Sequence, residues 1–189
     1  LIYDPGTGSV MMKVSKDTGS AEVWSKRQTA YRLLFADQTH IYFRDFTTPE
    51  NIKKISKEKG DVQTVIAKEY LAVEDAVIDD TNIYWTFGQG SDAGGISRRG
   101  VYKIPKSGGD VTTLVKGGGP ISIVLYGDYL YWIDGENHAI NKVSKNGGTV
   151  KEIIKGDYLS FLSQLAVDGT GIYFSTDDSS PTIRKIAAQ

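Results

Sequence analysis

Short segments rich in β-branched and aromatic residues alternate along the chain with clusters of Gly, Asp and Ser. No segment keeps the helical period of 3.6 residues, whereas these compositions are typical of strands and turns. Apolar residues also stand at adjacent positions, as in Ile83-Tyr84-Trp85. Because successive side chains of a strand point to opposite faces, this pattern predicts strands that are buried on both sides.

An apolar residue followed by Tyr recurs five times, and a second aromatic residue follows in four of the five copies. The tyrosines are separated by 39, 42, 47 and 42 residues. Downstream of each Tyr, a Lys is followed by Val or Ile. In the first four copies a second Lys comes next, with a Gly three residues after it, and such a Gly suits a tight hairpin. The repeated tyrosines are Tyr3, Tyr42, Tyr84, Tyr131 and Tyr173.

The third copy predicts four strands, from Leu71 to Ile78, Asn82 to Thr86, Gly100 to Pro105 and Val111 to Val115. Four short strands in a repeat of this length are typical of a β-propeller blade, whereas the main alternative, a β-solenoid, has shorter rungs. We therefore predict an all-β fold, a β-propeller of four-stranded blades, in one domain or fragment with repeats at about 1–28, 29–69, 70–117, 118–157 and 158–189.

The first and last copies each supply three strands and the other copies four, so that eighteen strands are expected. This is about four and a half blade units, either a five-bladed ring or part of a six-bladed one. We favour the fragment, which further blades or a partner chain would complete. The start at Leu1 without a signal peptide also suggests a processed or excised piece.

The segment Tyr131-Trp132-Ile133-Asp134 resembles the YWTD motif of low-density-lipoprotein-receptor class B repeats. The third copy matches its first three letters but has Phe87 in place of the Asp. An Asp stands five residues before the motif Tyr in three copies, at Asp37, Asp79 and Asp168, whereas the fourth copy has Tyr126 there. Bacterial propellers of this type look closer still, with a strand-turn signature like Lys103 to Gly109.

The resemblance covers almost the whole chain and implies a propeller that serves as a rigid binding platform. It implies that the motif Asp is structural, tying neighbouring strands through backbone hydrogen bonds, and this residue is kept only at Asp45 and Asp134. It implies no catalytic residue. It also favours a secreted or cell-envelope location.

The composition limits the classes of partner and of site that the chain can have. With 22 Lys and Arg against 23 Asp and Glu, the formal net charge is −1, which argues against nucleic acid or an anionic membrane surface as the main partner. No apolar run approaches the roughly 20 residues of a membrane span. The absence of Cys excludes disulfides and thiolate chemistry, and two His are too few for a His-rich metal cluster.

Binding residues are expected on loops, and in propellers the loops after strand two and strand four share one face. Three tyrosines that start predicted first strands could form an aromatic rim there, although each could simply pack where its strand begins. They are Tyr31, Tyr70 and Tyr158.

Charged residues occupy the same loops. The longest one, Phe87 to Gly100, carries Asp92 and the pair Arg98 and Arg99, which could grip a carboxylate or phosphate or could lie in a solvated Gly-rich loop. The corresponding loops of the next copies carry Glu136, His138 and Asp177. The carboxylates and Asn137 could bind Ca²⁺ through oxygen ligands, although no dense run like an EF-hand loop is present, and no other cofactor is expected.

No Gly-x-Ser-x-Gly, His-Glu-x-x-His or P-loop motif is present. Our leading hypothesis is therefore a non-catalytic propeller that binds a protein or a glycan through its loop face. The alternatives are a lactonase-like or lyase-like propeller enzyme with an oxygen-ligated metal at the channel mouth, and a purely architectural module.

Overall fold

The structure is a computed structural model that describes residues 2–4, 8–26, 31–45, 51–58, 62–66, 73–88, 98–157, 162–177 and 181–187. The chain divides into two compact units, Leu1–Leu71 and Ala72–Gln189. Within the described ranges no helix is long and apolar enough to span a bilayer.

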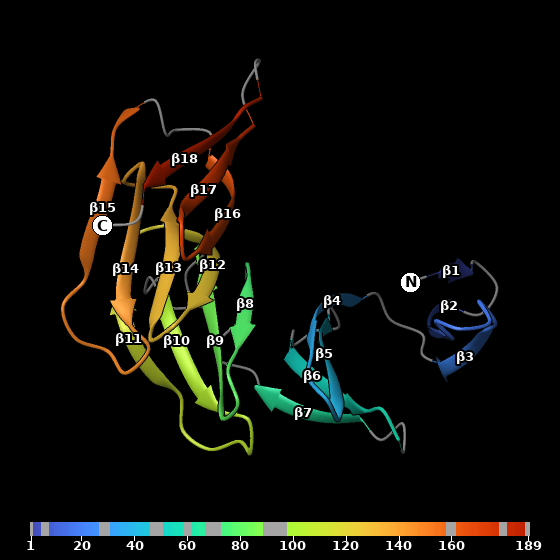
Figure 1. Ribbon diagram of the computed structural model, residues 1–189. Helices are drawn as coiled ribbons and strands as arrows, with labels where there is room; N and C mark the ends of the chain where they lie inside the picture. The colour runs from blue at the N-terminus through green and yellow to red at the C-terminus, as the bar shows by residue number, and fades with distance from the viewer. Residues whose placement is uncertain are drawn as a thin grey trace. The chain divides into compact units, whose positions relative to one another are not determined.

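The first unit contains two antiparallel sheets (Figure 1). One has three strands, β1 (Ile2–Asp4), β2 (Gly8–Val14) and β3 (Ala21–Lys26). The other has four, β4 (Tyr31–Ala36), β5 (His40–Asp45), β6 (Asn51–Ser56) and β7 (Val62–Ile66). Each strand pairs with the next one along the chain, which is the meander that the repeat predicts.

The second unit contains three such sheets (Figure 1). The first comprises β8 (Ala76–Ile78), β9 (Asn82–Phe87), β10 (Gly100–Pro105) and β11 (Thr112–Lys116). The next comprises β12 (Pro120–Tyr126), β13 (Tyr129–Asp134), β14 (Ala139–Ser144) and β15 (Lys151–Lys155), and the last β16 (Leu162–Asp168), β17 (Gly171–Thr176) and β18 (Ile183–Ala187). The described residues thus form the predicted eighteen strands, and the sheets are the blades of a β-propeller.

One predicted strand is shorter than expected. The pattern suggested a strand from Leu71 to Ile78, but β8 begins only at Ala76, and Leu71 lies outside the described residues. The reason lies at Asp75. The N–H of Asp75 donates to the side-chain hydroxyl of Thr86 at 3.2 Å, and the N–H of Thr86 donates to the carbonyl of Asp75 at 3.0 Å. The side-chain hydroxyl of Thr86 therefore takes the place of a backbone carbonyl as acceptor, and regular strand pairing begins only after Asp75.

A different irregularity occurs in the strand pairs β2–β3, β6–β7, β10–β11 and β14–β15. In each case the pairing register shifts by one residue, as in a β-bulge, which bends the outer strand. The shifts fall at Met11/Met12, Ile52/Lys53, Val101/Tyr102 and Ile140/Asn141.

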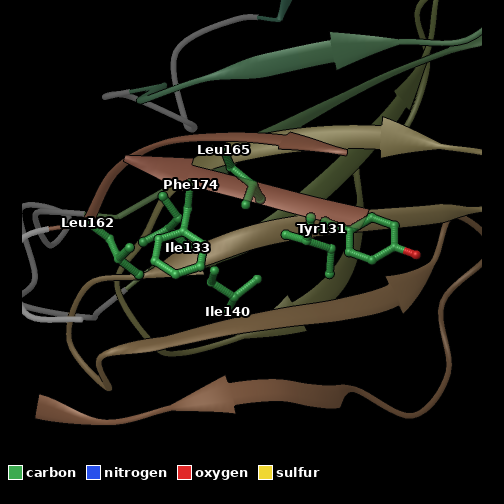
Figure 2. Close-up of a cluster of buried hydrophobic side chains, with 7 residues drawn as sticks. Tyr131, Ile133, Ile140, Leu162, Leu165 and Phe174 are labelled. Atoms are coloured by element: carbon green, nitrogen blue, oxygen red, sulfur yellow. The ribbon is translucent and has the colours of Figure 1, made fainter. Parts of the chain in front are cut away.

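Strand β13 shows why apolar residues occupy adjacent positions. Its residues from Leu130 onward are all buried, and they alternate between two interfaces. Leu130 and Trp132 share a hydrophobic cluster with Tyr84 of β9. Tyr131 shares the other cluster with Phe174 of β17 (Figure 2). Each sheet of the second unit is therefore covered by a neighbour, and each large side chain buried there contributes about 1.5–3 kcal/mol.

An Asp caps the turn between the first two strands in three sheets. Asp79 Oδ1 accepts the N–H groups of Thr81 and Asn82 at 2.8 and 2.7 Å, and its Oδ2 accepts the Tyr84 hydroxyl at 2.8 Å. Burial alone would raise the pKa of Asp79, but these hydrogen bonds outweigh it and hold the pKa below its usual value. The same Asp-x-Thr turn recurs at Asp37 and Asp168.

Adjacent sheets of the second unit are also tied by a carboxylate. Asp75, just before β8, accepts the N–H of Ile123 at 3.1 Å and the hydroxyl of Ser122 at 3.4 Å through Oδ2. Both partners lie in β12 of the next sheet. This bond fixes the first strands of the two sheets against each other.

Candidate functional site

The loops after the second and fourth strands meet at one end of the sheets in the second unit. The N–H of Gly117 donates to the carbonyl of Arg99 at 2.8 Å, and the N–H of Gly156 donates to that of His138 at 3.1 Å. Each loop after a second strand is thus bonded to the loop after the fourth strand of its sheet. We call this end the loop face; its described part consists of residues 98–99, 117–119, 135–138 and 156–157.

Asp134, the last residue of the YWTD-like segment, fixes this face. Its side chain is buried, with 6% exposed. Oδ1 accepts the N–H groups of Gly119 at 2.9 Å and Asn137 at 3.1 Å, and Oδ2 accepts the side-chain amide of Asn137 at 2.8 Å. One carboxylate therefore joins the loop before β12 to the loop after β13, and hydrogen bonds to a buried charge are strong.

Two glycines let these loops approach so closely. Gly118 has φ +70°, and a Cβ there would lie 2.5 Å from Asp134 Oδ2. A Cβ at Gly119 would lie 3.0 Å from the backbone nitrogen of Glu136. A side chain at either position would push the loops apart, so Gly118 and Gly119 are a packing requirement of the loop face.

An ion pair bridges two neighbouring sheets on this face. Arg99, which precedes β10, donates from Nη1 to Glu136 Oε2 in the β13–β14 loop at 2.9 Å. The side chains are 36% and 53% exposed, so both remain accessible to a partner. An exposed pair of this kind contributes at most about 1 kcal/mol to stability, so its contribution to the fold is small.

His138 follows Glu136 by two residues in the β13–β14 loop. It adopts φ 50°, the left-handed conformation, and is the one non-glycine residue with positive φ among those described. Its Nδ1 lies 3.7 Å from Asp157 Oδ1 in the next loop. The left-handed backbone turns the chain into β14 and leaves the imidazole partly exposed beside a carboxylate.

The structure brings together only some of the predicted binding residues. Arg99, Glu136 and His138 gather on the loop face, together with the backbone of Arg98, whose carbonyl accepts the Tyr102 hydroxyl. Asp177 is exposed just after β17, with no hydrogen bond or ion pair to any described residue.

Several other predicted residues lie wholly or partly outside the description. Tyr70, Asp92 and Tyr158 are not among the described residues, so the proposed aromatic rim remains a prediction. Tyr31 begins β4, Tyr3 lies in β1 and Asp45 ends β5, but their side chains lie outside the described part.

Of the other repeated tyrosines, Tyr42 and Tyr84 are buried and donate to Asp37 and Asp79. Burial, together with these carboxylates, raises the pKa of both hydroxyls, which therefore stay protonated at neutral pH. Tyr173 lies over Thr170, with its hydroxyl 2.6 Å from that of Thr170.

The loop face offers cationic, anionic and imidazole groups on a braced backbone, which suits recognition of polar or charged groups. Among the described residues no cluster of three or more Asp, Glu or His side chains could hold a metal ion. The expected Ca²⁺ therefore stays a prediction.

Three contributors to the loop face were missed from the sequence. Asp157 carries no motif of its own, and Asn137 was named only as a possible ligand, although its amide binds Asp134. The glycine run before Pro120 was a signal that could have been used, because three consecutive glycines in a short connection indicate close backbone approach.

Solved structures resemble this fold. Virginiamycin B lyase from Staphylococcus aureus, in its selenomethionine form, matches with a TM-score of 0.65 and 16% identity over 100% of this chain and 72% of that one. Oligogalacturonate lyase in complex with manganese matches with a TM-score of 0.67 and 11% identity over 91% of this chain and 54% of that one. The computationally designed Ika4 protein has a TM-score of 0.59 and 12% identity over 85% of this chain and 94% of its own.

At these identities the likeness establishes the fold alone. The chain spans about half of the oligogalacturonate lyase chain and about three quarters of the virginiamycin B lyase chain. No protein-family model matches the sequence, and a search of curated proteins also finds no match.

Proposed function

We propose that the chain is a YWTD-type propeller that acts as a non-catalytic binding platform and holds a protein or a glycan on its loop face. The observation that carries this proposal is the bracing by Asp134. A buried carboxylate with three hydrogen bonds holds two loops in one geometry, and accessible charged side chains project from them. Pre-organised loops lose little conformational entropy on binding, as a binding surface requires.

The chemistry of the described face favours a protein over a glycan. Arg99 Nη1 and Glu136 Oε2 present opposite charges 2.9 Å apart, and His138 adds an imidazole in the same loop as Glu136. Charges of both signs steer and orient a partner whose own surface is complementary, and Arg is common among residues that dominate binding energy. The aromatic platforms on which sugars stack are not among the described loop residues of this face.

Capture on the immobilised full-length chain tests the proposal. Wild type would be compared with the double variant Arg99→Ala/Glu136→Ala by mass spectrometry of bound proteins from native extract, with a glycan array run in parallel. We expect a partner that the double variant loses by at least about tenfold. A matched control is Asp110→Ala/Lys151→Ala, which removes one exposed acid and one exposed base near the turn between the third and fourth strands, at the opposite end of the sheets.

Three results would contradict the proposal. The first is equal loss of the partner in both double variants, because binding would then follow net charge. The second is no specific ligand in either assay. The third is turnover of a small substrate that a chelator abolishes, which would favour the enzyme alternative.

A location outside the cytoplasm belongs to the same proposal. It is supported by the resemblance to receptor-type repeats. Fractionation of the native source, followed by detection of the chain with an antibody, tests it. Detection of the protein only in the cytoplasmic fraction would contradict it.

A further inference from the structure

A pocket of about 230 Å³ lies at the end of the second unit opposite the loop face. It is bounded by the β12–β15 sheet on one side and the β16–β18 sheet on the other. Tyr126 ends β12 and Asp168 ends β16, so the pocket lies at the turns between first and second strands. Its polar and aromatic lining is Tyr126, Tyr131, Lys142 and Asp168.

The neighbouring crevice shows why this pocket is open. Between the β8–β11 and β12–β15 sheets, Lys145 Nζ lies 3.9 Å from Asp79 Oδ2 and 3.1 Å from Asp128 Oδ1. These contacts and the hydrogen bond to Asp128 raise the pKa of Lys145, which therefore remains charged. An ion pair thus bridges the two turns in this crevice.

The sequence replaces both partners of that bridge in the next pair of sheets. By the repeat spacing, Tyr126 takes the place of Asp79, and Ala188 takes that of Lys145. Ala188 lies outside the described residues, so its equivalence rests on the sequence alone. With an aromatic side chain in place of the acid and a methyl in place of the ammonium, the salt bridge that spans the first crevice cannot form in the second.

The side chains around the pocket leave several groups available to a ligand. Tyr126 is 43% exposed. Its hydroxyl reaches the opposite turn, because a Cβ at Gly169 would lie 3.1 Å from it. Asp168 uses Oδ1 to accept from Thr170 and Gly171, while no described residue bonds to its Oδ2.

A cation and two phenol rings complete the arrangement. Lys142 Nζ lies 4.9 Å from the ring centre of Tyr129 and 5.6 Å from that of Tyr131, within the range of a cation–π contact. Burial, with smaller contributions from Tyr129 and Tyr126, raises the pKa of Tyr131, so its hydroxyl is a donor at neutral pH. The pocket thus combines an aromatic face, hydrogen-bond donors and one carboxylate oxygen.

This combination fits a sugar ring. The C–H face of a pyranose can stack on an aromatic ring, while its hydroxyl groups need both donors and acceptors at the edges. The volume is below the roughly 300–1,000 Å³ of pockets that hold drug-sized ligands, so it suits one ring.

We propose that this pocket binds a single pyranose, stacked on Tyr126, with its hydroxyls hydrogen-bonded to Lys142 and Asp168. This site is independent of the loop face, because it lies at the other end of the strands. Its ligand is a monosaccharide unit, free or at the end of a glycan.

Saturation-transfer NMR on the full-length chain tests the proposal with four probes: methyl β-glucoside, methyl β-galactoside, N-acetylglucosamine and glucuronate. We expect transfer to at least one probe and a loss of affinity of about tenfold in Tyr126→Ala. Val150→Ala is the control, because Val150 is similarly exposed, at 40%, in the turn before β15 but does not line the pocket. Arg99→Ala on the loop face should bind as wild type does.

The outcomes separate the two proposals. Loss in Tyr126→Ala with binding retained in Val150→Ala and Arg99→Ala supports the pocket. Transfer to none of the four probes, or equal loss in Tyr126→Ala and Val150→Ala, overturns it. Loss only in Arg99→Ala would instead place sugar binding on the loop face. If Tyr126→Ala fails to fold, Lys142→Gln provides the decisive comparison, and unchanged affinity in that variant overturns the proposal.

Discussion

The β8–β11 and β12–β15 sheets have the same strand order, yet they are braced at opposite ends by different residues. At the turn end, Tyr84 donates to Asp79, whereas Tyr131 has no such acceptor because Tyr126 replaces the Asp. At the loop end, Asp134 joins two loops in the second sheet, whereas Phe87 occupies that place in the first. The repeated Asp before the motif Tyr therefore braces the turn end of the first sheet, whereas the motif Asp braces the loop end of the second.

The two sheets also keep different halves of the YWTD-like motif. The Thr survives in the first as Thr86, which bonds Asp75 and thereby supports the tie to β12. The Asp survives in the second as Asp134. A repeat can thus lose either the Thr or the Asp of the motif, provided that another hydrogen bond holds the same strand ends together.

Removal of the Asp134 carboxylate should lower the unfolding free energy more than any other change that distinguishes the two sheets. Asp134→Ala leaves the buried N–H of Gly119 without its acceptor and also removes the acceptor of the more exposed Asn137 N–H. Because hydrogen bonds to a buried charge are worth about 1.5–3 kcal/mol and do not add fully, we expect a loss of about 2–4 kcal/mol in unfolding free energy. Urea denaturation followed by the fluorescence of the buried Trp85 and Trp132 measures it.

An exposed acid provides the control for that variant. Asp110→Ala removes a carboxylate from the exposed turn after β10 and should change the unfolding free energy by less than about 0.5 kcal/mol. If Asp134→Ala cost no more than this, the loops would not depend on the carboxylate, and the rigid-platform proposal would lose its main support.

The glycine run should show the next largest effect. Gly118→Ala places a Cβ 2.5 Å from Asp134 Oδ2 at φ +70°, whereas Gly117→Ala at φ +85° meets nothing within 4 Å. Both pay the cost of a left-handed backbone, about 1–2 kcal/mol, but only Gly118→Ala also displaces the carboxylate. We expect Gly118→Ala to be less stable by a further 1 kcal/mol or so in the same urea assay.

In the double variant Gly118→Ala/Asp134→Ala the clash disappears with the carboxylate. The combined loss should therefore be smaller than the two single losses taken together, as for residues in contact. Strict additivity would contradict the contact, and equal stability of Gly117→Ala and Gly118→Ala would show that only the backbone conformation matters.

Much of the fold follows from the sequence because its physical causes are local. Alternation and turn residues predicted β10 to the residue, and the spacing of the tyrosines predicted how the strands group into sheets. The start of β8 was not predicted, because it depends on a hydroxyl from Thr86 in the next strand. Side-chain bonds across strands override the local pattern there.

The site could be predicted only in outline. Loop position singled out Arg99, Glu136 and His138, because loops after the second strand share one end of the sheets. The partner of His138, Asp157, comes from another loop, and no pattern within either segment records their distance. The pocket beside Tyr126 was also missed, since the substitution of Asp by Tyr gains meaning only when both sheets are placed.

A smaller effect should distinguish the two repeated tyrosines. Tyr84→Phe removes a 2.8 Å hydrogen bond to Asp79 and should cost about 1 kcal/mol. Tyr131→Phe removes a hydroxyl that bonds to no described residue and should cost less than about 0.5 kcal/mol. Equal losses in urea denaturation would show that Asp79 does not set the difference between the sheets.

The smallest expected effect is on the stability of the fold at acid pH. The hydrogen bonds from the turn hold the folded pKa of Asp79 below its ordinary value of 3.8, so its ionised form stabilises the fold at neutral pH. As pH falls below that ordinary value, the unfolded chain takes up the proton first, and this contribution is lost. Asp79→Asn should therefore lose less stability than wild type between about pH 5 and pH 3, although its stability at neutral pH is lower.

Asp80→Asn is the control for this pH dependence, because Asp80 is the exposed neighbour of Asp79 in the same turn. Its urea midpoint should follow wild type across the acid range, since the turn hydrogen bonds go to Asp79. Parallel curves for Asp79→Asn and wild type would contradict the assignment. The β12–β15 sheet has Tyr126 in place of this acid. In Tyr126→Asp the new carboxylate could accept the Tyr131 hydroxyl as Asp79 accepts that of Tyr84, and the unfolding free energy should then fall more steeply as the pH is lowered. That gain would show that one residue accounts for the difference between the two turns.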